Sequence, residues 1–188
     1  MSEHLVSVVR KTLLVLPIRR GYKASFFEGG IRVPLFMKWP SGIPEAAVRN
    51  GPVTQMDILP TLAAATGALI PENLNLDGRA LLSQDHDQDD LFWRNGGYRA
   101  YRKGNWKLQW LEQSDKVWLF DLATDPLEAY DLAAAEPARV NALMADLRAQ
   151  DGEQAPSAWP LQLEIPLAVD KTLEQPLLEG DEHIIFSN

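Results

Sequence analysis

The stretch that decides the fold is LFWRNGGYRAYRKGNWKLQWLEQSDKVWLF, residues 91–120. Aromatic and β-branched residues gather there in four short runs, which are Leu91–Trp93, Tyr98–Arg102, Trp106–Trp110 and Val117–Phe120. Lys103-Gly104-Asn105 is suited to a hairpin turn between the second run and the third. Because no helix-length segment separates the runs, we expect a small four-stranded antiparallel sheet.

Two amphipathic segments flank this sheet in the sequence. Residues 137–150 place four apolar side chains at helical spacing on one face: Val140, Leu143, Met144 and Leu147. This pattern predicts a C-terminal helix that packs on the sheet. Residues 54–66 predict an earlier helix, which Thr54 caps and Gly67 ends. Sheet and helices together indicate an α+β arrangement.

Other segments are predicted from the positions of proline and glycine and from the polarity of the residues between them. Val33–Trp39 is a largely apolar run that ends at Pro40, so we expect a buried strand. Arg79–Leu82 is expected to form a short turn of helix. Ser83–Asp90 is rich in aspartate but lacks the glycine and the terminal glutamate of a calcium loop, which favours a solvated acidic surface. Residues 151–188 contain four prolines and are expected to form an extended tail.

Tryptophan is concentrated in the predicted sheet, where four of the six tryptophans lie between Trp93 and Trp118. Such an aromatic stripe suits either a hydrophobic core or a platform for carbohydrate, and a core is the commoner outcome. We expect Asp57 and Asp121 to anchor a helix start and a turn. His4 and His183 have no partner in the sequence that would make them ligands or bases.

Composition excludes several functions. The 188 residues suffice for one domain or for a compact part of a larger one, and 46% of them are hydrophobic. A net charge of −8 argues against broad binding to nucleic acid or to an anionic membrane surface. The absence of cysteine excludes disulfides, thiolate metal ligands and a cysteine nucleophile. No apolar run approaches the roughly 20 residues that span a bilayer.

One lysine stands close to a glycine-rich turn, in the order Lys23, Glu28, Gly29, Gly30. An ammonium group is a compact charge with three donors, and glycines let backbone N–H groups approach a ligand. The pattern therefore fits an oxyanion site. A surface lysine beside an ordinary turn fits the same residues.

Five motifs in order resemble the C-terminal portion of a type I sulfatase, in the arylsulfatase-like branch of the alkaline phosphatase superfamily. They span about residues 18–150. The motifs are Arg20-Gly21-Tyr22-Lys23 with Phe27 to Pro34, Asp57 to Leu62, Leu76 to Arg79, Arg102 to Leu108, and Leu119 to Leu122 with Asp125 to Glu128. The resemblance implies an alkaline-phosphatase-like α/β fold for the complete enzyme, of which this chain would be the end.

The same resemblance implies a chemistry. Such enzymes hydrolyse sulfuric esters with a formylglycine nucleophile on a divalent cation, usually calcium. Lys23 falls on the family's sulfate-contacting lysine. Glu28, Gly29 and Gly30 would hold the turn that aims it, and Arg32 fits a structural ion pair better than a ligand. No catalytic or metal-ligating residue is expected in this chain.

The departures from the family pattern suggest a fragment that is inactive alone. No serine lies in a C/S-x-P/A-S-R context, and residues 1–22 contain neither Asp nor Asn. We expect residues 1–19 to be an irregular leader without a convincing signal peptide, 20–82 the end of the catalytic domain, 83–150 the sheet subdomain and 151–188 the tail. The partner would be a sulfate ester in the complete enzyme, with a separately encoded N-terminal half as a further candidate. Localisation stays unassigned.

Two other functions fit the same residues. The chain could be an accessory module that binds sulfated glycans through Lys23 and the aromatic sheet. It could also belong to a related phosphodiesterase or phosphonate hydrolase, although the motifs around Lys23 favour a sulfatase.

Overall fold

The computed structural model describes residues 19–82, 90–156, 158, 161–171 and 175–187. The chain divides into two compact units. The first combines the residues up to Arg32 with Phe92–Asn188, and the second is Val33–Leu91. The predicted leader, apart from Arg19, and the acidic loop, apart from Asp90, lie outside the described residues. The four-part domain division made from the sequence stays a prediction.

The sheet predicted from residues 91–120 is present and has four strands in the order β1-β2-β3-β4. The strands are β1 Asp90–Asn95, β2 Tyr98–Lys103, β3 Trp106–Leu111 and β4 Lys116–Asp121. Both the β2–β3 and the β3–β4 pairs are antiparallel. Gly104 takes a left-handed φ of 58° in the β2–β3 turn, where glycine has no Cβ to clash. A 3₁₀ turn, η2 (Glu112–Ser114), connects β3 to β4.

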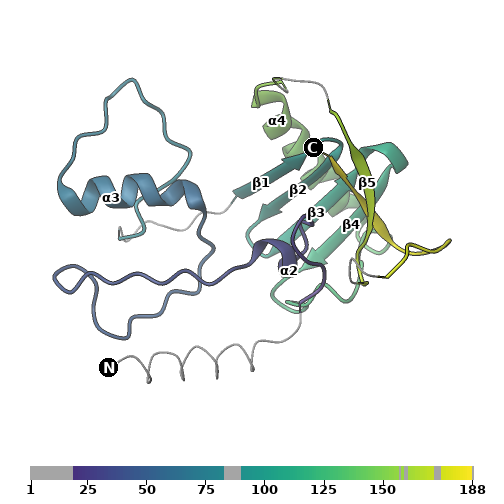
Figure 1. Cartoon of the computed structure of the whole chain (residues 1–188), viewed down its shortest axis with the longest axis horizontal. Helices are drawn as coiled ribbons and strands as arrows, with labels where there is room; N and C mark the ends of the chain where they lie inside the picture. The colour runs from purple at the N-terminus through teal and green to yellow at the C-terminus, as the bar shows by residue number, and fades with distance from the viewer. Residues whose placement is uncertain (1–18, 83–89, 157, 159–160, 172–174, 188) are drawn as a thin grey trace. The chain divides into compact units, whose positions relative to one another are not determined.

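Helix α4 (Pro137–Glu153) covers one face of this sheet (Figure 1). Leu143 and Leu147 are its buried side chains, and Val140 and Met144 pack beside them. They contact Tyr101, Leu108 and Leu119 of the strands. The predicted C-terminal helix and its apolar face are therefore confirmed. The fold class, α+β, is confirmed with them.

The opposite face of the sheet is covered by a hairpin that sequence analysis missed. It consists of β5 (Glu164–Ala168) and β6 (His183–Ser187), which pair in antiparallel register. Val169 and Ile184 enter a core cluster with Phe27 and Trp118. The tail is extended, as expected, but its two strands pair with each other although they are separated in sequence. Figure 1 shows the hairpin crossing the sheet.

The tryptophans of the sheet serve mainly as core. Trp118 is fully buried and Trp110 is 9% exposed. Arg139 lies over the ring of Trp106 at 4.0 Å. The sheet therefore offers no row of open aromatic faces among its described residues, which supports the core interpretation over a carbohydrate platform.

The second unit contains the predicted helix at residues 54–66. A 3₁₀ turn, η1 (Gln55–Asp57), leads into α3 (Ile58–Thr66), and Gly67 ends α3 with a left-handed φ of 71°. Asp57 is fully buried. Its carboxylate accepts the Thr54 N–H at 2.7 Å and the Arg79 N–H at 2.8 Å, so its predicted anchoring role is confirmed.

Two local predictions in this unit are wrong. Val33–Trp39 is not a strand, and no described strand pairs with it. Its apolar side chains are largely exposed, with Val33 at 76% and Phe36 at 81%. An apolar run becomes a strand only where a neighbouring strand accepts its backbone N–H and C=O groups. Arg79–Leu82 forms no helix. Its first amide is bonded to Asp57 and that of Leu81 to Thr61.

None of the described helices has the length and apolar character that crossing a membrane requires.

Candidate functional site

Lys23 lies at a tight, exposed turn of the first unit. The Ser25 N–H donates to the Tyr22 carbonyl at 3.0 Å, and the Ser25 hydroxyl donates to the same oxygen at 2.8 Å. Ala24 takes a φ of 87°, a left-handed conformation that costs free energy for a residue with a Cβ. Among the described residues, none forms a hydrogen bond or ion pair with the Lys23 ammonium group. The Lys23 side chain is exposed.

Helix α2 (Glu28–Ile31) is a single turn that packs against the backbone of the Lys23 turn. The Gly29 N–H donates to the Arg20 carbonyl at 2.8 Å. A Cβ on Gly29 would lie 2.4 Å from the Gly21 carbonyl oxygen, and one on Gly30 would lie 2.2 Å from that of Ser25. Both distances are too short for any side chain. The two glycines are therefore required by the close approach of two backbone segments.

Glu28 fixes α2 to the sheet through a buried ionic cluster. Lys107 of β3 is fully buried, and its ammonium lies 3.0 Å from Glu28 Oε1 and 2.9 Å from Glu128 Oε1. The Glu28 N–H donates to Glu128 Oε2 at 2.5 Å. One cation thus holds two carboxylates that come from distant segments. Lys107 and Glu128 lie within two of the motifs quoted from the sequence, but neither their burial nor their pairing with Glu28 was predicted.

The two carboxylates of this cluster have opposite pKa shifts. Burial alone would raise the pKa of Glu28, but the nearby charges of Lys107, Arg102 and Arg32 outweigh it and hold this pKa below its usual value. Burial raises the pKa of Glu128, and Lys107 offsets only part of that rise. Glu28 is therefore the more firmly ionised of the two.

A chain of hydrogen bonds extends the cluster to the segment before Glu28. Gln109 Nε2 donates to Glu128 Oε1 at 3.3 Å, and its Oε1 accepts the Tyr98 hydroxyl. The Tyr98 oxygen in turn accepts the Phe26 N–H at 3.0 Å. Burial raises the pKa of Tyr98, so the phenol stays protonated and keeps donating. Strands β2 and β3 thus hold Phe26 and Glu28 by side-chain contacts.

Arg32 forms an ion pair with Glu28 at 3.3 Å and leaves about half of its side chain exposed. Such a half-exposed pair contributes little to stability. Arg32 remains the outermost member of the cluster.

The described residues do not fit a calcium ion. No three acidic or histidine side chains among them converge as ligands for a metal. Calcium takes six to eight oxygen ligands, several of them carboxylates. His183 Nδ1 faces the Asp181 carbonyl at 3.1 Å and has a structural contact only. His4 lies outside the described residues.

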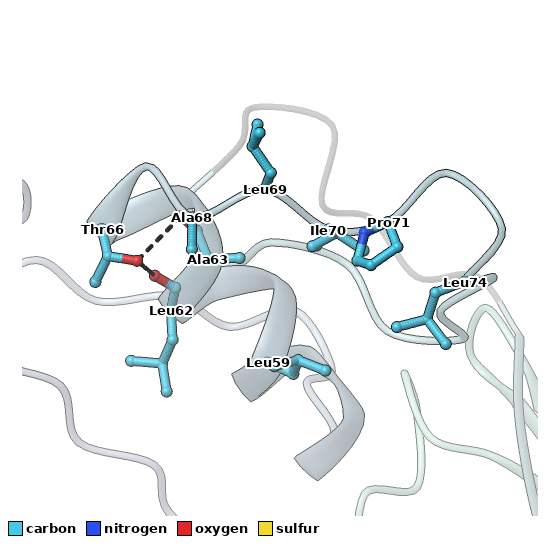
Figure 2. A pocket seen from close by; sticks show the side chains of 9 residues that line it. All are labelled: Leu59, Leu62, Ala63, Thr66, Ala68, Leu69, Ile70, Pro71 and Leu74. Carbon is cyan, nitrogen blue, oxygen red and sulfur yellow. Dashed lines mark hydrogen bonds between the residues drawn. The ribbon is translucent and has the colours of Figure 1, made fainter.

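The second unit contains an apolar hollow of about 270 Å³, which Figure 2 shows. Its walls come from α3 and from the loop after it, and they consist of Leu59, Leu62, Ala63, Thr66, Ala68, Leu69, Ile70, Pro71 and Leu74. None of the residues predicted to bind sulfate lines it. Because its walls carry no charge, it does not suit a sulfate group.

Comparison with known proteins supplies a family. Residues 22–153 match the model described as "N-sulphoglucosamine sulphohydrolase, C-terminal". The mouse steryl-sulfatase is 31% identical over 171 residues, which cover 80% of this chain and 27% of that protein. A sulfatase of Formosa agariphila is 29% identical over 140 residues and covers 62% of this chain.

Solved structures agree with this comparison. Ps i-CgsB superposes with a TM-score of 0.60 at 26% identity, over 71% of this chain and 32% of that one. BT33336S-sulf, from work on glycosaminoglycan metabolism by Bacteroides thetaiotaomicron, gives a TM-score of 0.59 over 77% of this chain and 35% of that one. At 24% identity the second likeness shows the fold alone. The chain spans about a quarter of the length of the mouse and Formosa relatives.

Proposed function

Since this chain belongs to the sulfatase family and corresponds to its C-terminal portion, we propose that it supplies the sulfate-binding corner of a sulfuric ester hydrolase, with Lys23 in contact with the sulfate group. The observation that carries this proposal is the exposed position of the Lys23 side chain on a supported turn. Its ammonium is exposed on a turn that α2 and the buried cluster hold in place.

The chemistry of sulfate transfer suits such a lysine. Negative charge on the sulfuryl oxygens and on the leaving group must be stabilised while the ester bond breaks. A cation held in position before the reaction supplies that stabilisation without reorganising. The Lys23 ammonium can donate to one sulfate oxygen and orient the ester, while Glu28, Gly29 and Gly30 fix the backbone from which Lys23 projects.

Nucleophile and metal ligands would come from outside these 188 residues. The chain has no cysteine, and its described residues offer no calcium ligands. Apolar side chains of the second unit are exposed, among them Phe36 at 81% and Leu59 and Leu62 at 55%. Because the relatives are much longer, we propose that these side chains contact the rest of the catalytic part, in the same polypeptide or in a separate one.

Two measurements test this function. Binding of inorganic sulfate to the chain by calorimetry should weaken roughly tenfold or more in Lys23→Ala, since a charge-assisted contact contributes about 1.5–3 kcal/mol. Lys38→Ala removes a lysine of the second unit that is also exposed and serves as the matched control. Equal sulfate affinity in the wild type and in Lys23→Ala would refute the role of Lys23.

The second measurement is turnover. The purified 188-residue chain should not hydrolyse an aryl sulfate such as nitrocatechol sulfate, with or without calcium. Metal-dependent hydrolysis by this chain would show that the machinery is complete and would contradict the division of labour proposed here.

An accessory role in glycan binding is less well supported. One solved structure of Ps i-CgsB holds k-i-k-neocarrahexaose, which shows that this similar protein binds an oligosaccharide. In the present chain, however, Trp110 and Trp118 are buried and cannot stack on a sugar ring. Calorimetry with a sulfated oligosaccharide would detect such binding, and its loss in Lys23→Ala would trace it to the same corner.

A further inference from the structure

Arg20 is the most heavily bonded side chain near the Lys23 turn. Its Nε donates to Asp170 Oδ1 at 3.0 Å, and its Nη2 donates to Asp170 Oδ2 at 2.9 Å and also to Glu182. The paired contact with Asp170 is the bidentate geometry in which a guanidinium binds a carboxylate most specifically. Asp170 follows β5 and Glu182 precedes β6, so both acids belong to the C-terminal hairpin.

The guanidinium is also held from the side of the core. Only 15% of the Arg20 side chain is exposed, and the group lies over the fully buried Phe27 ring at 4.8 Å. Glu182 is fixed in turn, because it accepts the indole N–H of the buried Trp118. Burial would lower the pKa of Arg20, but Asp170 and Glu182 outweigh it and raise this pKa. The contact is thus part of the packed structure of the first unit.

The backbone of Arg20 carries this restraint to the Lys23 turn. Its carbonyl accepts the Gly29 N–H at 2.8 Å, and Nη1 donates to the Glu128 carbonyl at 3.4 Å. Arg20 therefore joins the hairpin, α2 and the loop of Glu128. Gly21 follows it with a φ of 74°, and the chain then enters the Lys23 turn.

We propose that Arg20, Asp170 and Glu182 form a clamp through which the C-terminal hairpin positions Lys23 for sulfate. The three residues are positioning residues and touch no substrate. All three lie outside the stretch, 22–153, that matches the sulfatase family model. The proposal rests on the proposed function of Lys23, but its structural half can be measured independently.

The experiment compares three variants of the purified chain with the wild type. Asp170→Asn together with Glu182→Gln removes both negative charges from the clamp, leaves the charge of Arg20, and preserves side-chain size. Asp181→Asn is the matched control, because it removes a charge of the same hairpin that pairs with Lys171 and not with Arg20. Lys23→Ala reports on the sulfate contact itself.

Amide hydrogen exchange and affinity for inorganic sulfate are measured on each variant. In the double variant, amides of residues 21–25 should exchange about fivefold faster, as expected for losing a partly exposed bidentate ion pair. Amides of β3 should not change, which shows that the fold is intact. Sulfate affinity should fall about threefold to fivefold. Asp181→Asn should alter neither the turn nor the affinity.

The outcomes separate the two proposals. If exchange in residues 21–25 and sulfate affinity both stay at wild-type values in the double variant, the clamp is overturned, whatever Lys23→Ala does. If sulfate affinity falls equally in Asp181→Asn, a disturbance of the hairpin that does not involve Arg20 is responsible and the clamp is again overturned. If Lys23→Ala binds sulfate like the wild type, the function proposed for Lys23 fails, while exchange in the double variant still tests the clamp.

Discussion

The buried cation Lys107 gives the sharpest test of how α2 is held. Replacing it in Lys107→Met keeps an unbranched side chain of similar length but removes the charge. Glu28 and Glu128 would then lie in the same buried site, with exposures of 2% and 0%, without the ammonium that lies 3.0 Å and 2.9 Å from their oxygens.

Removing one partner of a buried ion pair costs about 3–5 kcal/mol, because the remaining charge stays desolvated and unpaired. Here two carboxylates lose the same cation, so we expect a value in the upper half of that range at neutral pH. Either carboxylate can relieve the loss by taking up a proton. The destabilisation should therefore shrink as the pH falls through the raised pKa values of the variant.

Urea unfolding monitored by tryptophan fluorescence measures this loss, since Trp118 lies in the adjoining core. Lys103→Met is the matched control. Lys103 is in the neighbouring strand β2 and pairs with Asp146, with about half of its side chain exposed, so its loss should cost at most about 1 kcal/mol.

Rescue sharpens the test. Adding Glu28→Gln and Glu128→Gln to Lys107→Met removes the unpaired charges and should recover a large part of the stability. Equal midpoints for Lys107→Met and Lys103→Met at pH 7 would refute the argument. A loss in Lys107→Met that is independent of pH would refute it as well.

Two further predictions concern the same corner. Gly30→Ala should destabilise the chain by about 1–3 kcal/mol, because the added Cβ has no room beside the Ser25 carbonyl. Gly152→Ala, which has open space in α4, should stabilise it by about 0.5–1 kcal/mol. Thermal unfolding of the two variants and the wild type checks the sign of each change. Glu28 has a lowered pKa, so its stabilisation is present above the unfolded value of about 4.3 and is lost as pH falls through the folded value. As the pH falls from 7 to 3, the unfolding midpoint should therefore decline less steeply in Glu28→Gln than in the wild type. It should decline more steeply in Glu128→Gln, because the pKa of Glu128 is raised. The same decline in the wild type and in both variants would contradict this assignment.

Local sequence patterns were sufficient where an element's partner is its neighbour in the chain. The strands of residues 91–120 are joined by short turns, so their close spacing and the turn at Gly104 predicted their pairing. Helix α4 was predicted from the spacing of its apolar residues, and the end of α3 from Gly67. The sequence drew attention to Gly29 and Gly30 of α2. It could not show that these positions require glycine because the Lys23 turn packs closely against them.

Where the partner is distant, prediction failed. Val33–Trp39 looks like a strand but pairs with none of the described strands. The hairpin of β5 and β6 was missed, because Pro166 and the long separation hide its pairing.

The sequence by itself determined the family, the α+β class, the central sheet and Lys23 as the candidate sulfate contact. Tertiary structure alone decided what holds Lys23 in place. Glu28, Lys107 and Glu128 come from three distant segments, and Arg20 meets acids more than a hundred residues away. A charged residue has no local pattern that distinguishes a solvated surface position from a buried pair. Burial and pairing depend on which surfaces the fold brings together, and only the folded chain specifies them.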